Sequence, residues 1–363
     1  MPDHWRKYLS LEVTRQVFFN GRRNLGRRVE QEGRSLSLHI GFPTALIYYS
    51  HFPFWQAYFN RLGVEVVTSP TTTKAILDDG AREAVADACI PIKLYHGHVL
   101  ALKDKVDALF IPRMVRLNRR TTFCPKFLGL PDMVRATLDK LPPIIDLQVD
   151  AGRNLWGLWP TCRGVAELLG FSRRLAWTAY LEGSHHQQAF EGLLLKGYLP
   201  LEAMAKLRGE PIEPAPLRPG SLNLAVLGYP YQVYDGYISL NIIAKLRKMG
   251  VNILTLEMVP QARLYRLSRR LPRRLFWHFS SLVVGATYHY LQQGDLDGII
   301  HVTAFGCGPD AMVDKIMELD IRNYSQGKMP FMSICIDEQT GDAGISTRLE
   351  AFVDMLLQRR AAR

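Results

Sequence analysis

The sequence lacks the signatures of several common enzyme classes. It has no G-x-x-x-x-G-K-[ST] motif, which excludes a P-loop ATPase site. No G-x-G-x-x-G follows an apolar strand and no G-x-S-x-G is present, so neither a dinucleotide fingerprint nor a hydrolase nucleophile elbow is found. Acidic residues are also scarce: 34 Asp and Glu stand against 45 Lys and Arg, giving a net charge of +11. Such a charge suits an anionic partner but identifies none.

Cysteine is also scarce, with five residues in a chain of 363. An odd, small number of cysteines argues against a disulfide framework, and no apolar secretory segment follows the first residues. We therefore expect reduced thiols and a cytoplasmic protein. The longest apolar stretch, residues 275–291, contains two histidines, two serines and a threonine. This composition predicts a buried helix rather than a membrane span.

A repeated pattern predicts the fold. Gly41-Phe42-Pro43 ends one apolar strand and Gly228-Tyr229-Pro230 ends another, and each is followed 22 residues later by a glycine typical of a helix end, Gly63 or Gly250. Both stretches therefore predict a β-α-β unit. Residues 106–110 and 296–300 are also similar, and a cysteine follows each. The repeat predicts an α/β protein of two similar lobes with parallel sheets.

The region between the two repeats lacks strand alternation, and a proline-rich stretch ends it. We expect a helical insert there and a stiff linker. The last helix is expected to begin near Thr347, where Thr and Glu350 have capping-box spacing. The predicted domains are a basic N-terminal helix or arm (1–35), a first α/β lobe (36–150), the helical insert and linker (151–220), and a second α/β lobe with a C-terminal helix (221–363).

Three cysteines are the strongest candidates for chemistry. Cys89, Cys124 and Cys307 each stand near Pro or Gly, in predicted loops. The repeat puts Cys124 and Cys307 at corresponding ends of the two lobes, and Gly306 and Gly308 allow a tight strand-to-helix turn at Cys307. A helix start there is expected to lower the pKa of that thiol. Three converging thiols suit a soft metal or an iron–sulfur cluster, although ordinary buried cysteines remain the alternative.

The other cysteines and the nearby lysines have weaker signals. Cys335 stands in an apolar strand and is expected in the core, yet it is near a strand end and is therefore the candidate fourth ligand. Cys162 is expected to be incidental. Lys93 and Lys126 are close in sequence to two of the thiols, where they could offset negative charge on a thiolate-bound cluster. Ordinary surface lysines are the alternative interpretation.

Histidine and arginine patterns are less specific. His96 and His98 are two residues apart and do not share a helix face, so helix-start or packing roles are favoured. Residues 263–274 form an acid-free arginine-rich run with leucines between, which predicts an amphipathic helix able to hold a phosphate, an acidic protein or nucleic acid. A solvated basic face is the alternative. The run has no interleaved stacking aromatics, so nucleic acid is not favoured.

Several of these motifs resemble one family. The stretches that carry the resemblance are 40–43, 52–55, 89–93, 96–98, 305–310, 337–338 and 347–352. They resemble the stand-alone proteins related to the activase and dehydratase components of the 2-hydroxyacyl-CoA dehydratase system, often called CoA protein activases. Members are similar to dehydratase subunits that bind a [4Fe–4S] cluster through three cysteines, and to double-cubane cluster reductases.

The resemblance implies a [4Fe–4S] or double-cubane cluster held by Cys89, Cys124 and Cys307. It also implies reduction at low potential by a separate ATP-dependent activase, and chemistry of an anaerobic, dehydratase or reductase type on a CoA thioester. A homodimer is compatible with it, since related dehydratase subunits pair; a membrane or nucleic-acid partner is not implied. The nucleotide-binding domain of an activase is not part of this resemblance, so ATPase activity is not expected. The alternative is a cofactor-free, two-lobed small-molecule binding or regulatory protein.

Overall fold

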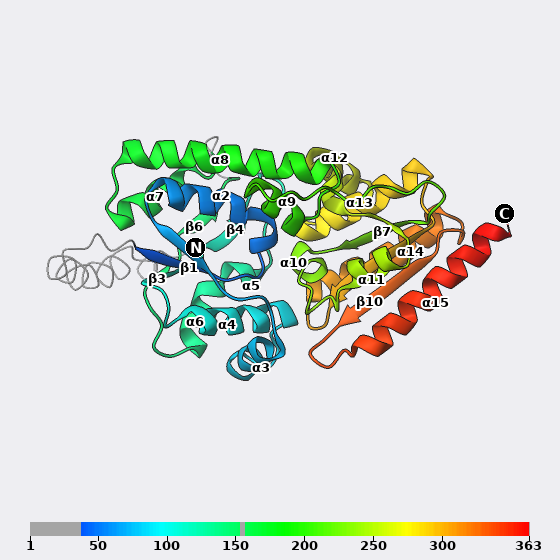
Figure 1. Cartoon of the computed structure of the whole chain (residues 1–363), viewed down its shortest axis with the longest axis horizontal. Coiled ribbons are helices and arrows are strands. Elements are labelled where there is room, and N and C mark those ends of the chain that lie inside the picture. Colours follow the sequence, from blue (N-terminus) through cyan, green and yellow to red (C-terminus); the bar gives the residue numbers. More distant parts are fainter. Residues whose placement is uncertain (1–37, 153–156, 363) are drawn as a thin grey trace.

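The computed structural model describes residues 38–152 and 157–362, which form two α/β lobes and a helical segment between them (Figure 1). Each lobe is built on a four-stranded sheet whose neighbouring strands are all parallel. The first sheet contains β1 (His39–Phe42), β2 (Glu65–Thr68), β3 (Ala108–Phe110) and β5 (Ile144–Ile145). The second contains β7 (Asn223–Gly228), β8 (Asn252–Leu254), β9 (Gly298–Ala304) and β10 (Phe331–Ile336).

The strand orders confirm the predicted repeat. The first sheet has the order β2-β1-β3-β5 and the second has β8-β7-β9-β10, so each lobe places its first strand between its second and its third. In an open parallel sheet with this order, the connections on the two sides of the first strand run over opposite faces of the sheet. Ligands bind at that switch point, beyond the carboxyl ends of the strands. The two lobes therefore each supply one such edge.

The first lobe surrounds its sheet with helices, and the first of them ends at the predicted glycine. The helices are α2 (Tyr48–Arg61), α3 (Lys74–Glu83), α4 (Ile90–Leu102), α5 (Pro125–Leu128) and α6 (Leu130–Thr137), and a small parallel sheet pairs β4 (Arg113–Arg116) with β6 (Gln148–Asp150). Gly63 follows α2 with a φ of +76°, which explains the glycine. The aromatic face of α2 packs on the sheet, with the Trp55 ring 4.5 Å from that of Phe110.

The second lobe carries the helices that follow β7. They are α10 (Pro230–Val233), α11 (Ile242–Lys248), the 3₁₀ turns η2 (Leu256–Met258) and η3 (Ser268–Arg270), α12 (Gln261–Leu267), α13 (His278–Gln293), α14 (Gly308–Tyr324) and α15 (Asp342–Ala361). Helix α13 covers most of the longest apolar stretch and is buried from His278 to Leu291, as its sequence predicted. Among the described helices, none combines the length and apolarity that a bilayer crossing needs.

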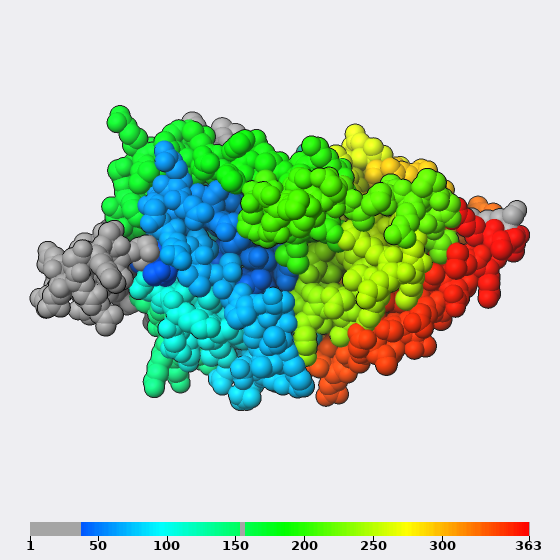
Figure 2. Space-filling model, viewed as in Figure 1, coloured from blue at the N-terminus to red at the C-terminus, as the bar shows by residue number. Residues whose placement is uncertain are grey.

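The helical insert connects the lobes and lies along both. It contains α7 (Trp159–Leu169), α8 (Arg173–Leu195) and α9 (Pro200–Leu207). Helix α8 packs on α2 of the first lobe and reaches η2 of the second, and Figure 1 shows it running along one side of the molecule. The space-filling view shows the insert and the linker, in green, over the upper part of the junction between the lobes, which touch each other directly below it (Figure 2). The basic arm predicted for 1–35 lies outside the described residues.

Two local predictions were wrong. The arginine-rich run is helical only in its first half: α12 ends at Leu267 and one 3₁₀ turn follows, because Pro272 lacks an N–H and restricts the residue before it. The last helix begins at Asp342, with Gly341 as its N-cap. The Thr347 hydroxyl donates to the Ala343 carbonyl within the helix instead of capping it.

Polar contacts join the lobes at their carboxyl-end edges. Asp235, in the second lobe, is 1% exposed and accepts hydrogen bonds from the hydroxyls of Thr72 (2.5 Å) and Tyr49 (3.1 Å) in the first. Nearby, the Thr122 carbonyl accepts a hydrogen bond of 2.7 Å from the backbone N–H of His278. One continuous cluster of buried apolar side chains extends through both lobes. The relative position of the two edges is therefore set by both packing and buried polar groups.

The close approach of α3 and α4 gives a stability prediction. A Cβ added at Gly97 in α4 would lie 1.8 Å from the Ile76 carbonyl oxygen in α3, so the two backbones would have to separate. We expect Gly97→Ala to lower the free energy of unfolding by about 3 kcal/mol or more. Gly192→Ala is the matched control, because Gly192 is also inside a helix but a Cβ there meets open space. It should raise the free energy of unfolding by about 0.5–1 kcal/mol. Urea denaturation followed by circular dichroism measures both, and equal stability of the two variants would contradict the close packing.

Candidate functional site

The three candidate cysteines occupy the same position relative to a helix. Cys89, Cys124 and Cys307 are the N-cap residues of α4, α5 and α14, each in extended conformation. A proline stands in the first two positions of every one of these helices. Proline is tolerated there because the first N–H groups of a helix have no partner within the helix. The sequence pattern of cysteine followed closely by proline thus places each thiol at a helix start.

The structure brings the three cysteines together from both lobes. Cys124 and Cys307 line one small cavity, which has a volume of about 20 Å³. Cys89 is adjacent: a side chain built on Gly306 would begin 3.3 Å from the Cys89 Cα. Gly306 itself has a φ of +74°, so the turn before Cys307 needs glycine both for its conformation and for this close approach. None of the three forms a disulfide.

Aromatic side chains form the walls of this cavity. The other residues that line it are Phe123, Phe127, Pro309, Tyr229, Tyr231, Trp277, His278, Phe279 and Ser280. The Phe279 ring lies 5.5 Å from that of Tyr231 and 5.6 Å from that of Tyr229, whose hydroxyl is 2.7 Å from Ser280 Oγ. The site therefore has a largely apolar surface. These residues were not among the candidates from the sequence, although Tyr229 and Tyr231 follow β7 at its carboxyl end, where ligands bind in open α/β sheets.

The electrostatics of the thiols differ from the prediction. Burial raises the pKa of Cys89 and of Cys124 above the ordinary value. The pKa of Cys307 is raised strongly by burial and then by Asp310, Cys89 and Cys124, so the expected lowering by the helix start was wrong. Hydrogen bonds from backbone amides at the start of each helix lower the pKa of the thiols, but burial raises it by more. Burial therefore favours the protonated, neutral form of all three thiols.

The secondary candidates lie in different surroundings. Lys126 donates to the Asp87 carbonyl (2.8 Å), and its charge lowers the pKa of both Cys89 and Cys124, so it is near the site as predicted. Lys93 instead forms an ion pair of 2.5 Å with Glu338 of the other lobe.

Of the remaining cysteines, Cys335 is exposed on the edge strand β10, so its expected core position was wrong. The charged neighbours that raise its pKa, after burial, are Asp310, Asp314 and Asp337, and no other cysteine is among them. Cys162 is fully buried in α7, away from the cavity, as an incidental residue would be. Gly308 stands at the start of α14, where a Cβ would meet open space.

A buried ion pair includes Asp310, which stands in the first turn of α14, the helix that Cys307 caps. His301, on β9, is fully buried, with Nδ1 2.7 Å from Asp314 Oδ1 and Nε2 3.4 Å from Asp310 Oδ1. Asp310 is also fully buried, and neither of its carboxylate oxygens has a hydrogen-bond partner among the described residues. Burial lowers the pKa of His301, but the two carboxylates outweigh it and raise that pKa to about 9. The cationic form of His301 is therefore favoured at neutral pH.

The two histidines singled out in the sequence, His96 and His98, do not line the cavity. His96 and His98 are both fully buried inside α4, and His98 is held by Ser69 Oγ (2.8 Å) and Thr72 Oγ1 (3.0 Å), which confirms packing roles. Within 38–152 and 157–362, no group of three or more His, Cys, Asp or Glu side chains is arranged to hold a single metal ion.

The family assignment follows from a comparison with known protein families. The model of the CoA enzyme activase uncharacterised domain, DUF2229, matches residues 39–259. The chain belongs to this family. The match contains Cys89, Cys124 and the aromatic loop after β7, and it confirms the expected relation to CoA protein activases. A search of curated proteins found no match. Cys307 lies beyond the matched residues, on the second half of the repeat.

The charge of His301 gives a pH-dependent prediction. Its pKa is about 9 in the folded chain and about 6.5 in an unfolded one, so its stabilisation is complete below pH 6.5 and is lost as the pH rises through 9. The shift corresponds to about 3 kcal/mol in the free energy of unfolding. Urea denaturation between pH 6 and 9.5 should show that His301→Gln is much less stable than wild type at pH 6 and that the gap narrows with rising pH. His186→Gln, which changes a half-exposed histidine on α8, is the control. A gap that stays constant with pH would contradict a cationic His301.

Proposed function

We propose that this protein holds a [4Fe–4S]-type cluster between its two lobes and uses it for low-potential electron transfer or for reductive or dehydratase chemistry. One observation carries the proposal: Cys124 and Cys307, which come from different lobes and are 183 positions apart, line the same cavity, with Cys89 beside them. Three free thiols at one junction are the donor set that iron–sulfur clusters use.

The residues at the junction fit such a group. In a cluster each cysteine binds a different iron, so the thiols stand farther apart than the ligands of a single ion, and the absence of a compact single-ion site among the described residues is compatible with it. Iron would displace the protons that burial now keeps on the thiols. The aromatic walls contributed by Phe123, Phe127 and Phe279 limit contact with water, which tunes the potential of buried clusters.

The chain's own residues have definable roles around the bound group. Backbone amides at the starts of α4, α5 and α14 point their positive ends toward the thiolates, and Lys126 adds a full positive charge. The buried imidazole of His301 lies 3.4 Å from the side chain of Asp310, in the first turn of the helix that Cys307 caps. A four-iron cluster held by three cysteines supplies an electron and one iron with an open coordination position.

The partners follow from the family. The electron source in this proposal is a separate ATP-dependent activase, because the resemblance does not include the nucleotide-binding domain of an activase. A CoA thioester is the proposed substrate class, taken from the family's relation to CoA enzymes. A homodimer is part of the same proposal and is tested by the mass in solution.

Metal analysis of cysteine variants tests the proposal. Wild type purified and reconstituted without oxygen should contain about four iron and four acid-labile sulfide per chain, or about eight of each for a double cubane. Cys89→Ser, Cys124→Ser and Cys307→Ser should each lose most of both, because every one removes a proposed ligand. Cys335→Ser is the matched control, since its thiol is exposed on β10 and it should retain the wild-type content.

Two outcomes would contradict the proposal. The first is an iron-free wild type after anaerobic reconstitution, which would favour the alternative of a cofactor-free small-molecule binding protein. The second is full iron content in Cys307→Ser. Circular dichroism of each variant shows whether a loss of iron reflects the missing ligand or a missing fold.

A further inference from the structure

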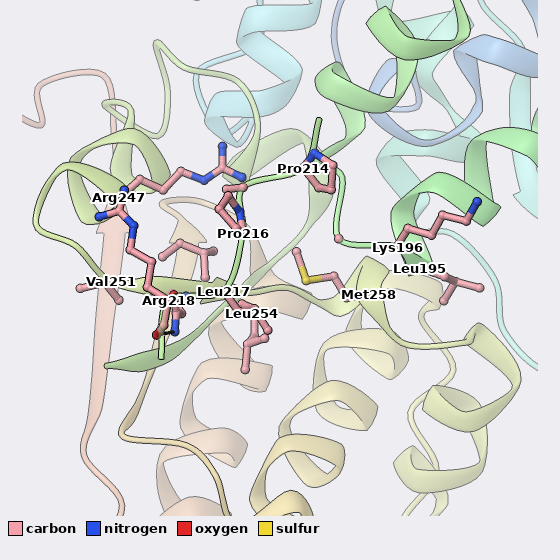
Figure 3. Close-up of a pocket in the computed structure, with 14 residues that line it drawn as sticks. Leu195, Lys196, Pro214, Pro216, Leu217, Arg218, Arg247, Val251, Leu254 and Met258 are labelled. Atoms are coloured by element: carbon pink, nitrogen blue, oxygen red, sulfur yellow. Dashed lines mark hydrogen bonds between the residues drawn. The ribbon is translucent and has the colours of Figure 1, made fainter. Parts of the chain in front are cut away.

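A second cavity lies away from the cysteines, at the edge of the second sheet (Figure 3). It has a volume of about 450 Å³, within the range of small-molecule sites. Its walls come from the end of α8, the linker, Arg247 of α11, the edge strand β8 with the residue before it, and Met258 of η2. None of these residues lines the cysteine cavity.

A short segment of the linker, residues 213–218, crosses this cavity and is fixed at both ends; we name it the strap. At one end the Glu213 carboxylate accepts from Lys206 Nζ (2.6 Å) and the Tyr198 hydroxyl (2.9 Å). At the other end the Asn252 side chain accepts from the Arg218 N–H (2.8 Å) and donates to its carbonyl (3.0 Å). Between these ends the strap contains two prolines, which stiffen it. Hydrogen bonds at both ends therefore fix the position of the strap over the cavity.

The two ends of the cavity differ in chemistry. Figure 3 shows Arg218 and Arg247 at one end, Met258 in the middle, and Leu195 and Lys196 at the other end, where the Lys196 ammonium points away from the labelled residues. The lining contains no carboxylate. Its apolar side chains include Leu195 and Leu217, which are 47% and 63% exposed, unusually high for leucines that line a cavity.

The arginine end has unused binding capacity. Arg247 Nη1 forms an ion pair of 2.5 Å with Glu202, but its Nε is buried and has no hydrogen-bond partner among the described residues. The Arg218 guanidinium has no carboxylate partner within the described chain, although Asn252 fixes its backbone. Two guanidinium groups with free N–H donors beside an apolar floor suit an anionic group that carries an apolar chain.

We propose that this cavity binds a small amphiphile, with its carboxylate or phosphate at Arg218 and Arg247 and its apolar chain under the strap along Leu217, Leu254, Met258 and Leu195. Binding covers the exposed leucines and supplies acceptors to the buried arginine Nε. The site is independent of the proposed cluster, since the two cavities share no residue.

Calorimetric titration of the full chain tests this site, with decyl phosphate, decanoate and uncharged decyl maltoside as probes below their micelle concentrations. Wild type should bind at least one of the two anions, and the tighter one identifies the head group. Arg218→Ala should weaken that binding by about tenfold or more. Leu217→Asp should weaken it similarly, because it places a negative charge beside the apolar chain. Arg322→Ala, an exposed arginine of α14 outside the cavity, is the matched control and should leave binding unchanged.

The proposal is overturned if neither anion binds, if decyl maltoside binds as tightly as the anions, or if both Arg218→Ala and Leu217→Asp bind like wild type. Arg218 and Leu217 are exposed, so both variants are expected to fold, and thermal unfolding checks this. The iron content of the same variants should equal that of wild type. A failure of the cluster proposal therefore leaves this test unaffected, and the reverse also holds.

Discussion

The carboxylate of Asp235 is buried between the two lobes and accepts hydrogen bonds from both. Tyr49 and Thr72 donate from the first lobe, and the backbone amides of Tyr237 and Ile238 donate from the second. A buried carboxylate is tolerated only while such donors surround it, so the lobes can pack in few other orientations. That orientation turns the two carboxyl-end edges toward each other. The convergence of the three cysteines depends on it.

Much of this arrangement could be predicted from local sequence signals. The Gly-aromatic-Pro repeat identified both first strands, because glycine and proline end a strand in a way that few other residues do. Cysteines beside Pro or Gly were correctly interpreted as loop residues, and the repeat placed Cys124 and Cys307 at facing edges. These signals span only a few residues, and the parallel β-α-β rule then supplies the long-range arrangement.

What could not be predicted depends on contacts between distant segments. Burial raises the pKa of Cys307, whereas its position at a helix start predicted a lower pKa. The aromatic rings of Tyr231 and Phe279 come from other segments, so the sequence around Cys307 does not predict that burial. Cys335 follows the alternation of an apolar strand, but β10 is an edge strand with an exposed position there. The strap looked like a plain linker, since its anchors, Tyr198 and Asn252, lie outside the proline-rich stretch.

The order of the elements along the chain has a consequence for biosynthesis. All strands of the first sheet are complete by Ile145, whereas Cys307 is made 162 residues later. Domains fold as units while the rest of the chain is still being synthesised, so the first lobe is expected to form with Cys89 and Cys124 on an uncovered edge. During that interval the two thiols are accessible to oxidants. The second lobe covers the site once it has folded. The site can therefore be completed only during the last third of translation.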